Sequence, residues 1–319
     1  MLINVYIEYN RLRNTFTYSC DSHVEVGCRV RVEFNNRTLI GFVEEVDVES
    51  DFKNIKPVIE VIDEKPLLNC ELKLLADYMA DFYASSKVTC YKTMLPPALR
   101  PSSNHSKVIY EDYAELKESD LPLTSRQKEV LTSFTYPCKM SELRKVSSSI
   151  AKALLDKGYI GIEKRIKDSN THVSSITDVQ HELTSEQEYA IEAIHSTDKT
   201  VSLLHGVTGS GKTEVFLRLA ENVLACGKQV LFLVPEIGLT PMMIQRVQAR
   251  FQQKIAIYHS GLNAQEKLEQ YNLVKDKKVD VVVGTRSACF MPFSSLGLIL
   301  MDEEHDSSYK QDNTPRYHT

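Results

Sequence analysis

The sequence has no apolar run long enough to cross a membrane, and it does not begin with the apolar core of a signal peptide. A transmembrane helix needs about 20 consecutive, mostly apolar residues. Hydrophobic residues make up 42% of the 319 residues and charged residues 25%, as is usual for globular proteins. These features predict a cytoplasmic protein without a membrane partner, with room for two or three domains.

Paired cysteine motifs are also missing. The seven cysteines are odd in number, and none of them forms a C-x-x-C pair. This spacing argues against a zinc site within the chain and indicates reduced thiols rather than disulfides.

A global excess of positive charge is absent as well, because the formal net charge is −5. The charge is uneven, however, since residues 124–167 contain ten Lys and Arg against four acidic residues. Such a local excess is compatible with contacts to nucleic-acid phosphates, and many solvated helix faces look the same.

One stretch prescribes a specific chemistry. Residues 206–213, GVTGSGKT, match the phosphate-binding pattern G-x-x-x-x-G-K-[ST] at every fixed position. An apolar run over 201–204 predicts a strand before this phosphate loop, and apolar residues at helical spacing predict a helix over 214–226. Glycines let backbone N–H groups converge on a triphosphate, and the helix turns its positive end to the anion. The residues expected to bind ATP are Gly206, Thr208, Gly209, Ser210, Gly211, Lys212 and Thr213.

A phosphate loop needs carboxylate partners, because Mg²⁺ must be held and a water must be oriented for attack. Residues 298–301 predict a buried strand that ends in Asp302 and Glu303. Lys212 should reach the β- and γ-phosphates, and Thr213 with Asp302 should hold Mg²⁺. Glu303 is the expected base or water-orienting group. The two motifs together predict hydrolysis of a nucleoside triphosphate.

Residues 1–105 predict a small β-rich domain. Apolar residues at helical spacing over 67–82 add a helix that packs on the sheet. The pair Asn35 and Asn36 suits a hairpin turn. The predicted strands cover 2–8, 16–18, 29–34 and 38–46.

Residues 106–175 predict a winged-helix domain with polar linkers at 100–107 and 168–178. Helical patterns cover 124–134, 140–146 and 149–157, and a strand pair is expected over 158–163. Three helices and a β-hairpin is the order of a winged helix, whose third helix can enter a DNA groove. A winged helix can equally serve as a spacer or a protein contact.

Residues 176–319 predict an α/β lobe of the RecA-like type. Strands and helices alternate, which indicates a mostly parallel sheet with helices on both faces and ligands at the carboxyl ends of the strands. The predicted strands cover 201–204, 229–234, 254–258, 280–283 and 298–301, and the helices 214–226, 241–251 and 264–275.

Several stretches at predicted strand ends resemble the motifs of superfamily 2 helicases. Gln187 precedes the phosphate loop, where many of these proteins place an adenine-reading glutamine. Residues 233–240 (LVPEIGLT) look like motif Ia, 284–288 (GTRSA) like motif Ib, and 302–305 (DEEH) like motif II. With a β-rich unit and a winged helix ahead of them, the whole chain resembles the PriA family of bacterial replication-restart helicases, the primosomal N′ proteins.

The resemblance implies an ATP-dependent 3′-to-5′ DNA helicase that recognises stalled or repaired forks and helps to reload the replicative helicase. It implies forked and single-stranded DNA, single-stranded DNA-binding protein and primosome proteins as partners, in the cytoplasm at the bacterial nucleoid. His305 would pass the ATP state to the DNA path. That path would be lined by Pro235, Glu236, Leu239, Thr240, Thr285, Arg286 and Ser287.

The family also has an aromatic-rich loop after motif II, in which rings can stack on bases and cations can contact phosphates. An ordinary polar loop is the alternative. The matching residues are Tyr309, Lys310, Gln311, Arg316, Tyr317 and His318.

In the family, an aromatic-Asp-Tyr stretch helps to capture the 3′ end of a nascent strand. Phe16, Thr17 and Tyr18 stand at that stretch, with Gly41 and Lys56 at matching positions. The threonine replaces a carboxylate that would accept hydrogen bonds from the terminal sugar, and a hydroxyl accepts them more weakly.

The family continues with a zinc-binding region and a second lobe that carries an arginine finger, and these parts do not occur before Thr319. A missing finger costs about 10³ to 10⁵ in rate in related sites. We therefore expect a fragment that binds DNA and does not unwind it. There are two alternative hypotheses. The chain could be another superfamily 2 translocase, acting on RNA or protein–DNA complexes, or a non-catalytic fork-binding module.

Overall fold

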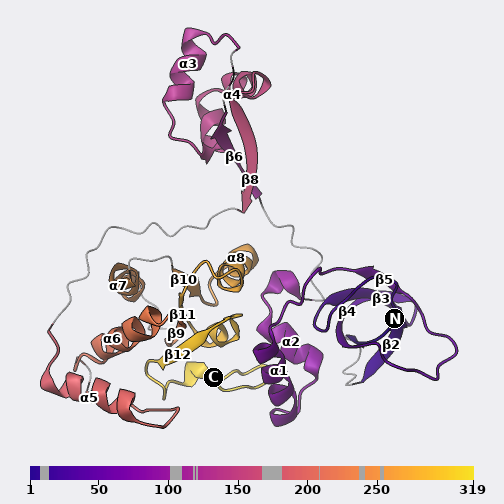
Figure 1. The fold of residues 1–319 in the computed structure, drawn as a ribbon, viewed down its shortest axis with the longest axis vertical. Coiled ribbons are helices and arrows are strands. Elements are labelled where there is room, and N and C mark those ends of the chain that lie inside the picture. The colour runs from indigo at the N-terminus through magenta and orange to yellow at the C-terminus, as the bar shows by residue number, and fades with distance from the viewer. Residues whose placement is uncertain are drawn as a thin grey trace. The chain divides into compact units, whose positions relative to one another are not determined.

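The computed structural model describes residues 1–7, 14–100, 110–117, 119, 121–166, 182–207, 209–236, 241–251 and 255–319 (Figure 1). Contacts divide the chain into two compact units, of which one joins residues 1–105 with 172–319 and the other comprises 106–171. The predicted linkers lie almost wholly outside the described residues, and the three-domain division stays a prediction. Among the described helices, none has the length and apolar character that a membrane span requires.

The first unit begins with a five-stranded antiparallel sheet in the order β2-β1-β4-β3-β5. Its strands are β1 (Leu2–Ile7), β2 (Thr15–Ser19), β3 (Arg29–Phe34), β4 (Arg37–Val46) and β5 (Val58–Val61). Alternate residues of β1, including Ile3 and Val5, are fully buried, as the period of two predicts. Asn35 and Asn36 take φ values of 47° and 58°, so the predicted hairpin turn is confirmed. The sequence did not reveal β5.

Two helices follow the sheet, α1 (Cys70–Phe82) and α2 (Lys87–Met94), and then a 3₁₀ turn, η1 (Pro97–Leu99). The helix predicted over 67–82 is confirmed, but it begins at its N-cap Asn69, whose Oδ1 accepts a 2.9 Å hydrogen bond from the Leu72 N–H. The pattern missed α2, because its buried residues include neighbours such as Cys90 and Tyr91 and so show no single apolar face.

The C-terminal part of this unit is a parallel sheet in the order β10-β11-β9-β12 (Figure 1). The strands are β9 (Gln229–Leu233), β10 (Ile255–Tyr258), β11 (Val281–Gly284) and β12 (Leu296–Met301), and the helices are α5 (Ser185–Ser196), α6 (Lys212–Ala225), α7 (Pro241–Phe251) and α8 (Ala264–Lys275). Every residue of β9, β10 and β11 is buried, as in a sheet covered on both faces. The predicted α/β class with a parallel sheet is confirmed.

The strand predicted over 201–204 is not formed. These residues belong to no described strand, and Val201 and Leu203 are 84% and 73% exposed. Within the described part of the chain, β12 is an edge strand, and its Ile299 is 54% exposed. An apolar run predicts burial, but it does not identify the strand with which the segment would pair. A segment forms a strand only where a neighbouring strand provides backbone hydrogen bonds.

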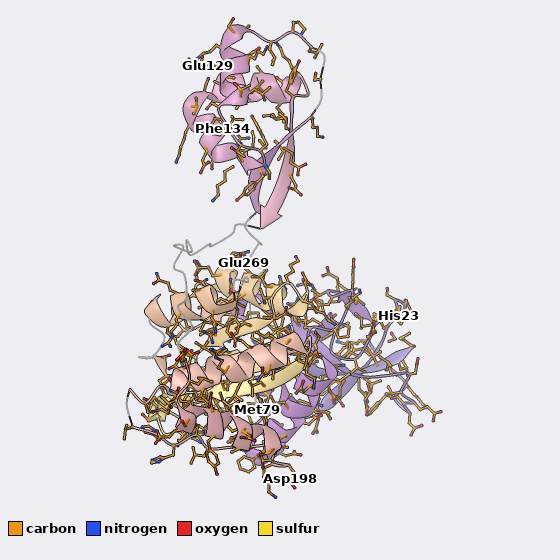
Figure 2. All side chains as sticks on the ribbon, turned by 60° about the vertical axis from the view of Figure 1, so that its left-hand side comes forward. His23, Met79, Glu129, Phe134, Asp198 and Glu269 are labelled. Carbon is orange, nitrogen blue, oxygen red and sulfur yellow. The ribbon has the colours of Figure 1, made fainter. Side chains whose placement is uncertain are left out.

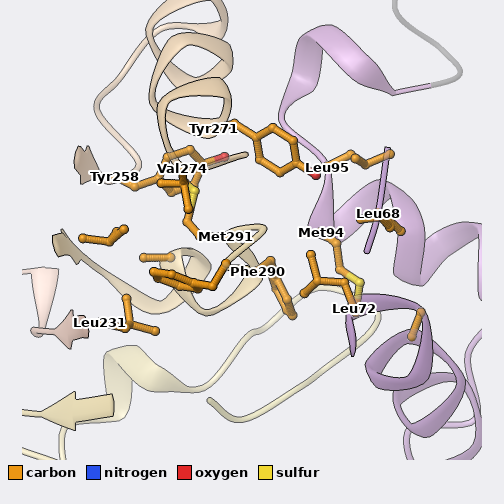
Figure 3. Close-up of a cluster of buried hydrophobic side chains, with 14 of the residues drawn as sticks. Leu68, Leu72, Met94, Leu95, Leu231, Tyr258, Tyr271, Val274, Phe290 and Met291 are labelled. Atoms are coloured by element: carbon orange, nitrogen blue, oxygen red, sulfur yellow. The ribbon is translucent and has the colours of Figure 1, made fainter. Parts of the chain in front are cut away.

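The N-terminal helices and the parallel-sheet region share one hydrophobic core (Figure 3). Met79 of α1 lies inside this unit (Figure 2) and is 2% exposed. The Tyr271 hydroxyl donates a 2.8 Å hydrogen bond to the Leu67 carbonyl, and Asn69 Nδ2 donates at 2.7 Å to the Phe293 carbonyl. The shared core contains Leu68, Leu72, Met94 and Leu95 from the N-terminal region with Tyr258, Val274, Phe290 and Met291 from the other.

The second unit has a three-stranded antiparallel sheet in the order β7-β6-β8. Its elements are β6 (Tyr110–Leu116), α3 (Ser125–Thr132), β7 (Cys138–Lys139), α4 (Met140–Asp156) and β8 (Ile160–Ile166). Non-helical dihedrals at Ser147 divide α4, in agreement with two predicted helical segments. Phe134, labelled in Figure 2 beyond Glu129 of α3, packs on the core of this unit.

The strand pair predicted over 158–163 is wrong. This region forms the single strand β8, whose partner is β6, from Tyr110↔Ile166 to Leu116↔Ile160. The local pattern indicated a strand correctly, but its partner lies far upstream in the sequence, and the folded chain brings the two together.

Candidate nucleotide-binding site and DNA path

The phosphate loop leads directly into α6, whose N-cap is Gly211. Gly209 and Gly211 have φ values of 82° and 81°, in the left-handed region that glycine adopts readily. A Cβ on Gly209 would meet no atom within 4 Å, whereas one on Gly211 would lie 2.2 Å from Gln187 Nε2. The loop is therefore open at Gly209 and closely packed at Gly211. Thr208 lies outside the described residues.

Gln187 ties the start of α5 to the phosphate loop. Its Nε2 donates to the Ser210 carbonyl at 3.1 Å, and its Oε1 accepts from the Thr184 N–H at 3.0 Å. The Thr184 hydroxyl accepts in turn from the Gln187 N–H at 3.3 Å, which completes a capping box. Sequence reasoning missed this contact, although Thr and Gln three residues apart already indicate the cap.

Lys212 folds back over its own loop. Its Nζ donates to the carbonyls of Gly206 at 2.8 Å and Val207 at 3.2 Å. Phosphate oxygens are stronger, charged acceptors, so a bound triphosphate would draw the ammonium group away from these carbonyls. The glycine geometry and this lysine donor fit the β- and γ-phosphates of a nucleotide.

Asp302 lies at the end of β12, where its N–H donates at 2.9 Å to the Leu233 carbonyl of β9. Burial raises the pKa of its carboxyl, the charge of Glu303 raises it further, and the positive charge of Lys212 acts in the opposite direction. The charge of Lys212 therefore acts on Asp302 through space. Glu303 has φ of 47° and is exposed to solvent.

The residues near the phosphate loop suit a magnesium ion that is bound together with nucleotide phosphates. They suit a metal ion held by protein side chains alone less well. Among the described residues, no group of three or more His, Cys, Asp or Glu could hold a metal ion. Mg²⁺ usually binds through one or two carboxylates together with substrate phosphates and water. The half-buried Thr213 and Asp302 match that requirement.

The segment after Asp302 packs into the protein. Tyr309, in η4 (Ser307–Tyr309), is fully buried, and its hydroxyl donates at 2.7 Å to the Asp302 carbonyl. Tyr317 is 4% exposed and stacks edge-on against Phe290 with ring centroids 5.0 Å apart. The prediction that the Tyr309 ring stacks on a base does not fit this arrangement, because the ring has no exposed face.

The cations of this segment stay accessible. Lys310 and Arg316 are exposed, with Lys310 Nζ 5.6 Å above the Tyr83 ring and Arg316 Nε donating to the Asp312 carbonyl at 3.1 Å. His305 is exposed too, 3.6 Å from Glu303 Oε2. These positions suit contacts to a ligand better than the buried rings do.

Arg286 turns toward the protein. It begins η3 (Arg286–Phe290), and its Nη1 donates to the carbonyls of Ser308, at 3.0 Å, and Lys310. Its guanidinium also lies 6.0 Å from the centre of the Tyr317 ring. Arg286 therefore holds the segment that follows Asp302, a contact that the sequence pattern did not indicate.

The strand ends bring the other predicted DNA-binding residues together. The Val234 N–H donates to the Gly284 carbonyl at 3.0 Å, which joins the ends of β9 and β11. Pro235 is buried and Glu236 exposed after β9, while Thr285 is 4% exposed and Ser287 is half-buried after β11. Thr240 lies outside the described residues.

Of the residues predicted to capture a 3′ end, Phe16 and Tyr18 lie in β2, Gly41 lies in β4, and Lys56 precedes β5. Tyr18 is 3% exposed and its hydroxyl donates to the Glu33 carbonyl at 3.2 Å, while burial raises its pKa to about 12. Lys56 forms an exposed 2.9 Å ion pair with Glu33. The half-buried Phe16 ring lies 4.6 Å from that of Phe34. The buried Tyr18 thus supports the sheet instead of offering a free ring.

Gly41 has a structural explanation. It pairs with Ile7 of β1, and a Cβ at this position would lie 2.5 Å from Val5 Cγ1 and 2.6 Å from the Tyr6 carbonyl. Only glycine allows β1 and β4 to approach so closely.

A phosphate loop that opens a helix, together with an acid-ended strand of a parallel sheet, is typical of P-loop nucleotide-binding proteins. Residues 184–318 match the DEAD/DEAH box helicase family model, and residues 4–96 match the 3'DNA-binding domain (3'BD) model of PriA proteins.

Curated relatives named replication restart protein PriA extend this similarity. The Bacillus subtilis protein is 32% identical over 389 residues, covering 95% of this chain and 48% of the relative. The Treponema pallidum protein is 36% identical over 318 residues, covering 96% and 39%. The Synechocystis protein is 46% identical over 175 residues, covering 54% and 21%. The chain belongs to the PriA family, and it spans about half or less of the length of these relatives.

Proposed function

We propose that this chain supplies the 3′-end-binding module and one ATP-binding lobe of an ATP-dependent 3′-to-5′ DNA helicase that restarts replication at stalled or repaired forks. The observation that carries the proposal is that the match to the DEAD/DEAH box helicase family, which includes Lys212 and Asp302, and the match to the 3'DNA-binding domain fall in one unit of the chain. Under this proposal, the nucleotide site and the DNA-end module belong to the same unit.

The nucleotide residues have distinct parts in this proposal. Magnesium ATP supplies the free energy of phosphoryl transfer when it is bound. Lys212 would exchange the carbonyls of Gly206 and Val207 for phosphate oxygens. Thr213 and Asp302 would hold Mg²⁺, and the exposed Glu303 would orient the attacking water or accept its proton.

DNA would lie across the carboxyl ends of β9 and β11. The half-buried Ser287 hydroxyl and the backbone around Thr285 would contact phosphates without reading bases. Lys310 and Arg316 would add exposed positive charge. Single-stranded DNA-binding protein and primosome proteins are the partners proposed at the nucleoid.

We assign a winged helix to the second unit as part of the same proposal. Its support is the order of α3, the divided α4 and β8, together with the basic excess of residues 124–167. Binding of forked DNA to this part of the chain would test it.

A non-catalytic fork-binding module is the second candidate. It is favoured by the missing strand at 201–204, ahead of the phosphate loop. In that case the chain would bind forks without hydrolysing ATP.

ATP hydrolysis by the purified 319-residue chain distinguishes the candidates. We expect slow hydrolysis that forked DNA stimulates more than RNA does, and that Lys212→Ala reduces by about 10²-fold or more. Stimulation by RNA instead would indicate another superfamily 2 translocase. Fork binding with no hydrolysis above the Lys212→Ala background would leave the non-catalytic module.

A further inference from the structure

Glu214 is the first residue after the phosphate loop, and its carboxylate is buried in a network of arginines. The residue is 5% exposed, which is rare for a glutamate unless it is paired. Its Oε1 lies 2.8 Å from Arg250 Nη2 and 3.4 Å from Arg218 Nε, and its Oε2 lies 3.4 Å from Arg246 Nη2. The residues of this Glu214 network are Glu214, Arg218, Glu221, Arg246 and Arg250.

The network joins two helices. Glu214 and Glu221 stand on α6, and Arg246 and Arg250 on α7. Arg250, with its side chain 1% exposed, spans both acids, because its Nε is 2.6 Å from Glu221 Oε1. Separating the partners of such a buried pair leaves an uncompensated charge, so the ion pairs oppose a displacement of α7 relative to α6.

Apolar packing surrounds these ion pairs. Val215 and Leu219 of α6 lie in the same core cluster as Val247 of α7, and all three are almost completely buried. The ring of Phe251 at the end of α7 lies 6.3 Å from that of Phe232 in β9. A displacement of α7 would therefore disturb both the ion pairs and the core.

The two helices begin at the two predicted ligand sites. α6 begins at Lys212, and the Glu214 N–H donates at 2.9 Å to the Gly211 carbonyl, within the first turn. α7 begins at Pro241, shortly after Pro235 and Glu236 at the end of β9. The Glu214 network is thus a polar contact between the helix that begins in the phosphate loop and the helix that follows Pro235 and Glu236 in the sequence.

We propose that Arg246 and Arg250 are positioning residues that couple Lys212 of the phosphate loop to the predicted DNA-binding residues Pro235 and Glu236 through Glu214. Nucleotide bound at Lys212 fixes the first turn of α6, Glu214 transmits that position to α7, and the start of α7 sets the affinity for single-stranded DNA. The inference rests on the proposed function, since it needs both ligands. By linkage, DNA changes the affinity for nucleotide by the same factor.

Arg246 is the member of the network suited to a test. Its side chain is 39% exposed and its contact with Glu214 is long at 3.4 Å, so its removal should leave the fold intact. Arg218 is the matched control, because it contacts the same carboxylate at the same 3.4 Å but belongs to α6 itself. Arg246→Met interrupts the link between helices, whereas Arg218→Met removes an equal charge within one helix.

The experiment measures the affinity of the 319-residue chain for fluorescein-labelled oligo(dT), with and without a non-hydrolysable ATP analogue and Mg²⁺. Coupled sites typically change each other's affinity about 5- to 150-fold. The coupling factor is the ratio of the oligo(dT) affinities measured with and without the ATP analogue. We expect Arg246→Met to bring this ratio to within about twofold of one, while each ligand alone binds as it does to the wild type. Arg218→Met should keep the wild-type factor, and Arg246→Lys, which retains the charge, should give an intermediate one.

Several outcomes would overturn the inference. An Arg246→Met protein with the wild-type coupling factor would overturn it. An equal loss of coupling in Arg218→Met would also overturn it, because the effect would then depend on the charge next to Glu214 and not on the link between the helices. Independent binding of the two ligands to the wild type would also exclude it. If Arg246→Met does not melt cooperatively, Arg246→Lys decides by the same criterion. Failure of the wild type to bind either ligand by itself is a separate result, and it would refute the proposed function as well.

Discussion

The hydroxyl of Tyr309 donates a 2.7 Å hydrogen bond to the main-chain carbonyl of Asp302. The Tyr309 ring is fully buried, and burial raises its pKa, so the hydroxyl stays protonated and remains a donor at all ordinary pH values. The segment that follows β12 therefore fixes the main chain of Asp302, the candidate magnesium ligand.

Tyr309→Phe should lower both stability and ATP hydrolysis. It leaves the Asp302 carbonyl without this donor, which costs about 1–3 kcal/mol, and it loosens the candidate magnesium ligand. Thermal unfolding and the ATPase rate measure the two effects. Tyr271→Phe is the control, because it removes an equivalent 2.8 Å bond to the Leu67 carbonyl in the shared core. Equal effects of the two variants on hydrolysis would contradict a positioning role for Tyr309.

Gly211→Ala should weaken nucleotide binding. An alanine pays about 1–2 kcal/mol for the left-handed backbone, and its Cβ would displace Gln187 from the phosphate loop. Gly227→Ala is matched to it, because Gly227 also has a positive φ, of 70°, but a Cβ there meets no atom within 4 Å. Titration with a fluorescent ATP analogue should show reduced affinity for Gly211→Ala only, and a similar reduction for Gly227→Ala would count against the Gln187 contact.

Asp302→Asn should raise the melting temperature at about pH 7. Burial and Glu303 raise the pKa of the Asp302 carboxyl, so the folded state favours its protonated form. The stability that this group contributes is present at low pH and is lost as the pH rises through its folded pKa. The asparagine cannot ionise, so its advantage should shrink as the pH falls toward the ordinary range of Asp, about 3.9.

Asp306→Asn provides the opposite sign for comparison. Hydrogen bonds from Ser308 hold the pKa of the Asp306 carboxyl below its usual range, so its ionised form stabilises the fold. The asparagine should therefore not raise the melting temperature at neutral pH. An Asp302→Asn protein that melts at or below the wild-type temperature across the whole pH series would contradict the expected direction.

Asn69→Ala should destabilise the junction between the N-terminal helices and the parallel-sheet region. It removes the N-cap of α1, worth about 0.5–2 kcal/mol, and the 2.7 Å donor to the Phe293 carbonyl. Asn69→Asp keeps the capping oxygen and loses only the donor, so its melting temperature should lie between those of the wild type and the alanine variant. If Asn69→Asp melts like the wild type, the contact with Phe293 contributes no stability.

Local patterns predicted much of the secondary structure because their causes are local. The bounds of α7, α8 and β3 were predicted to the residue. The missed β5 and β6 and the absent strand over 201–204 have a common cause, since strand pairing depends on residues distant in the sequence. The apolar pattern did not predict α2, because this helix buries residues on more than one face.

The sequence by itself determined the phosphate loop, the acids after β12 and the parallel α/β class, because fixed spacing and hydrophobic periodicity act within a few residues of the chain. Only the tertiary structure decided that Tyr309 and Tyr18 are buried, that Arg286 holds the segment after Asp302, and that Glu214 meets the arginines of α7. Which side chain meets which carbonyl or charge depends on how distant elements pack, and a linear pattern carries no information about that packing.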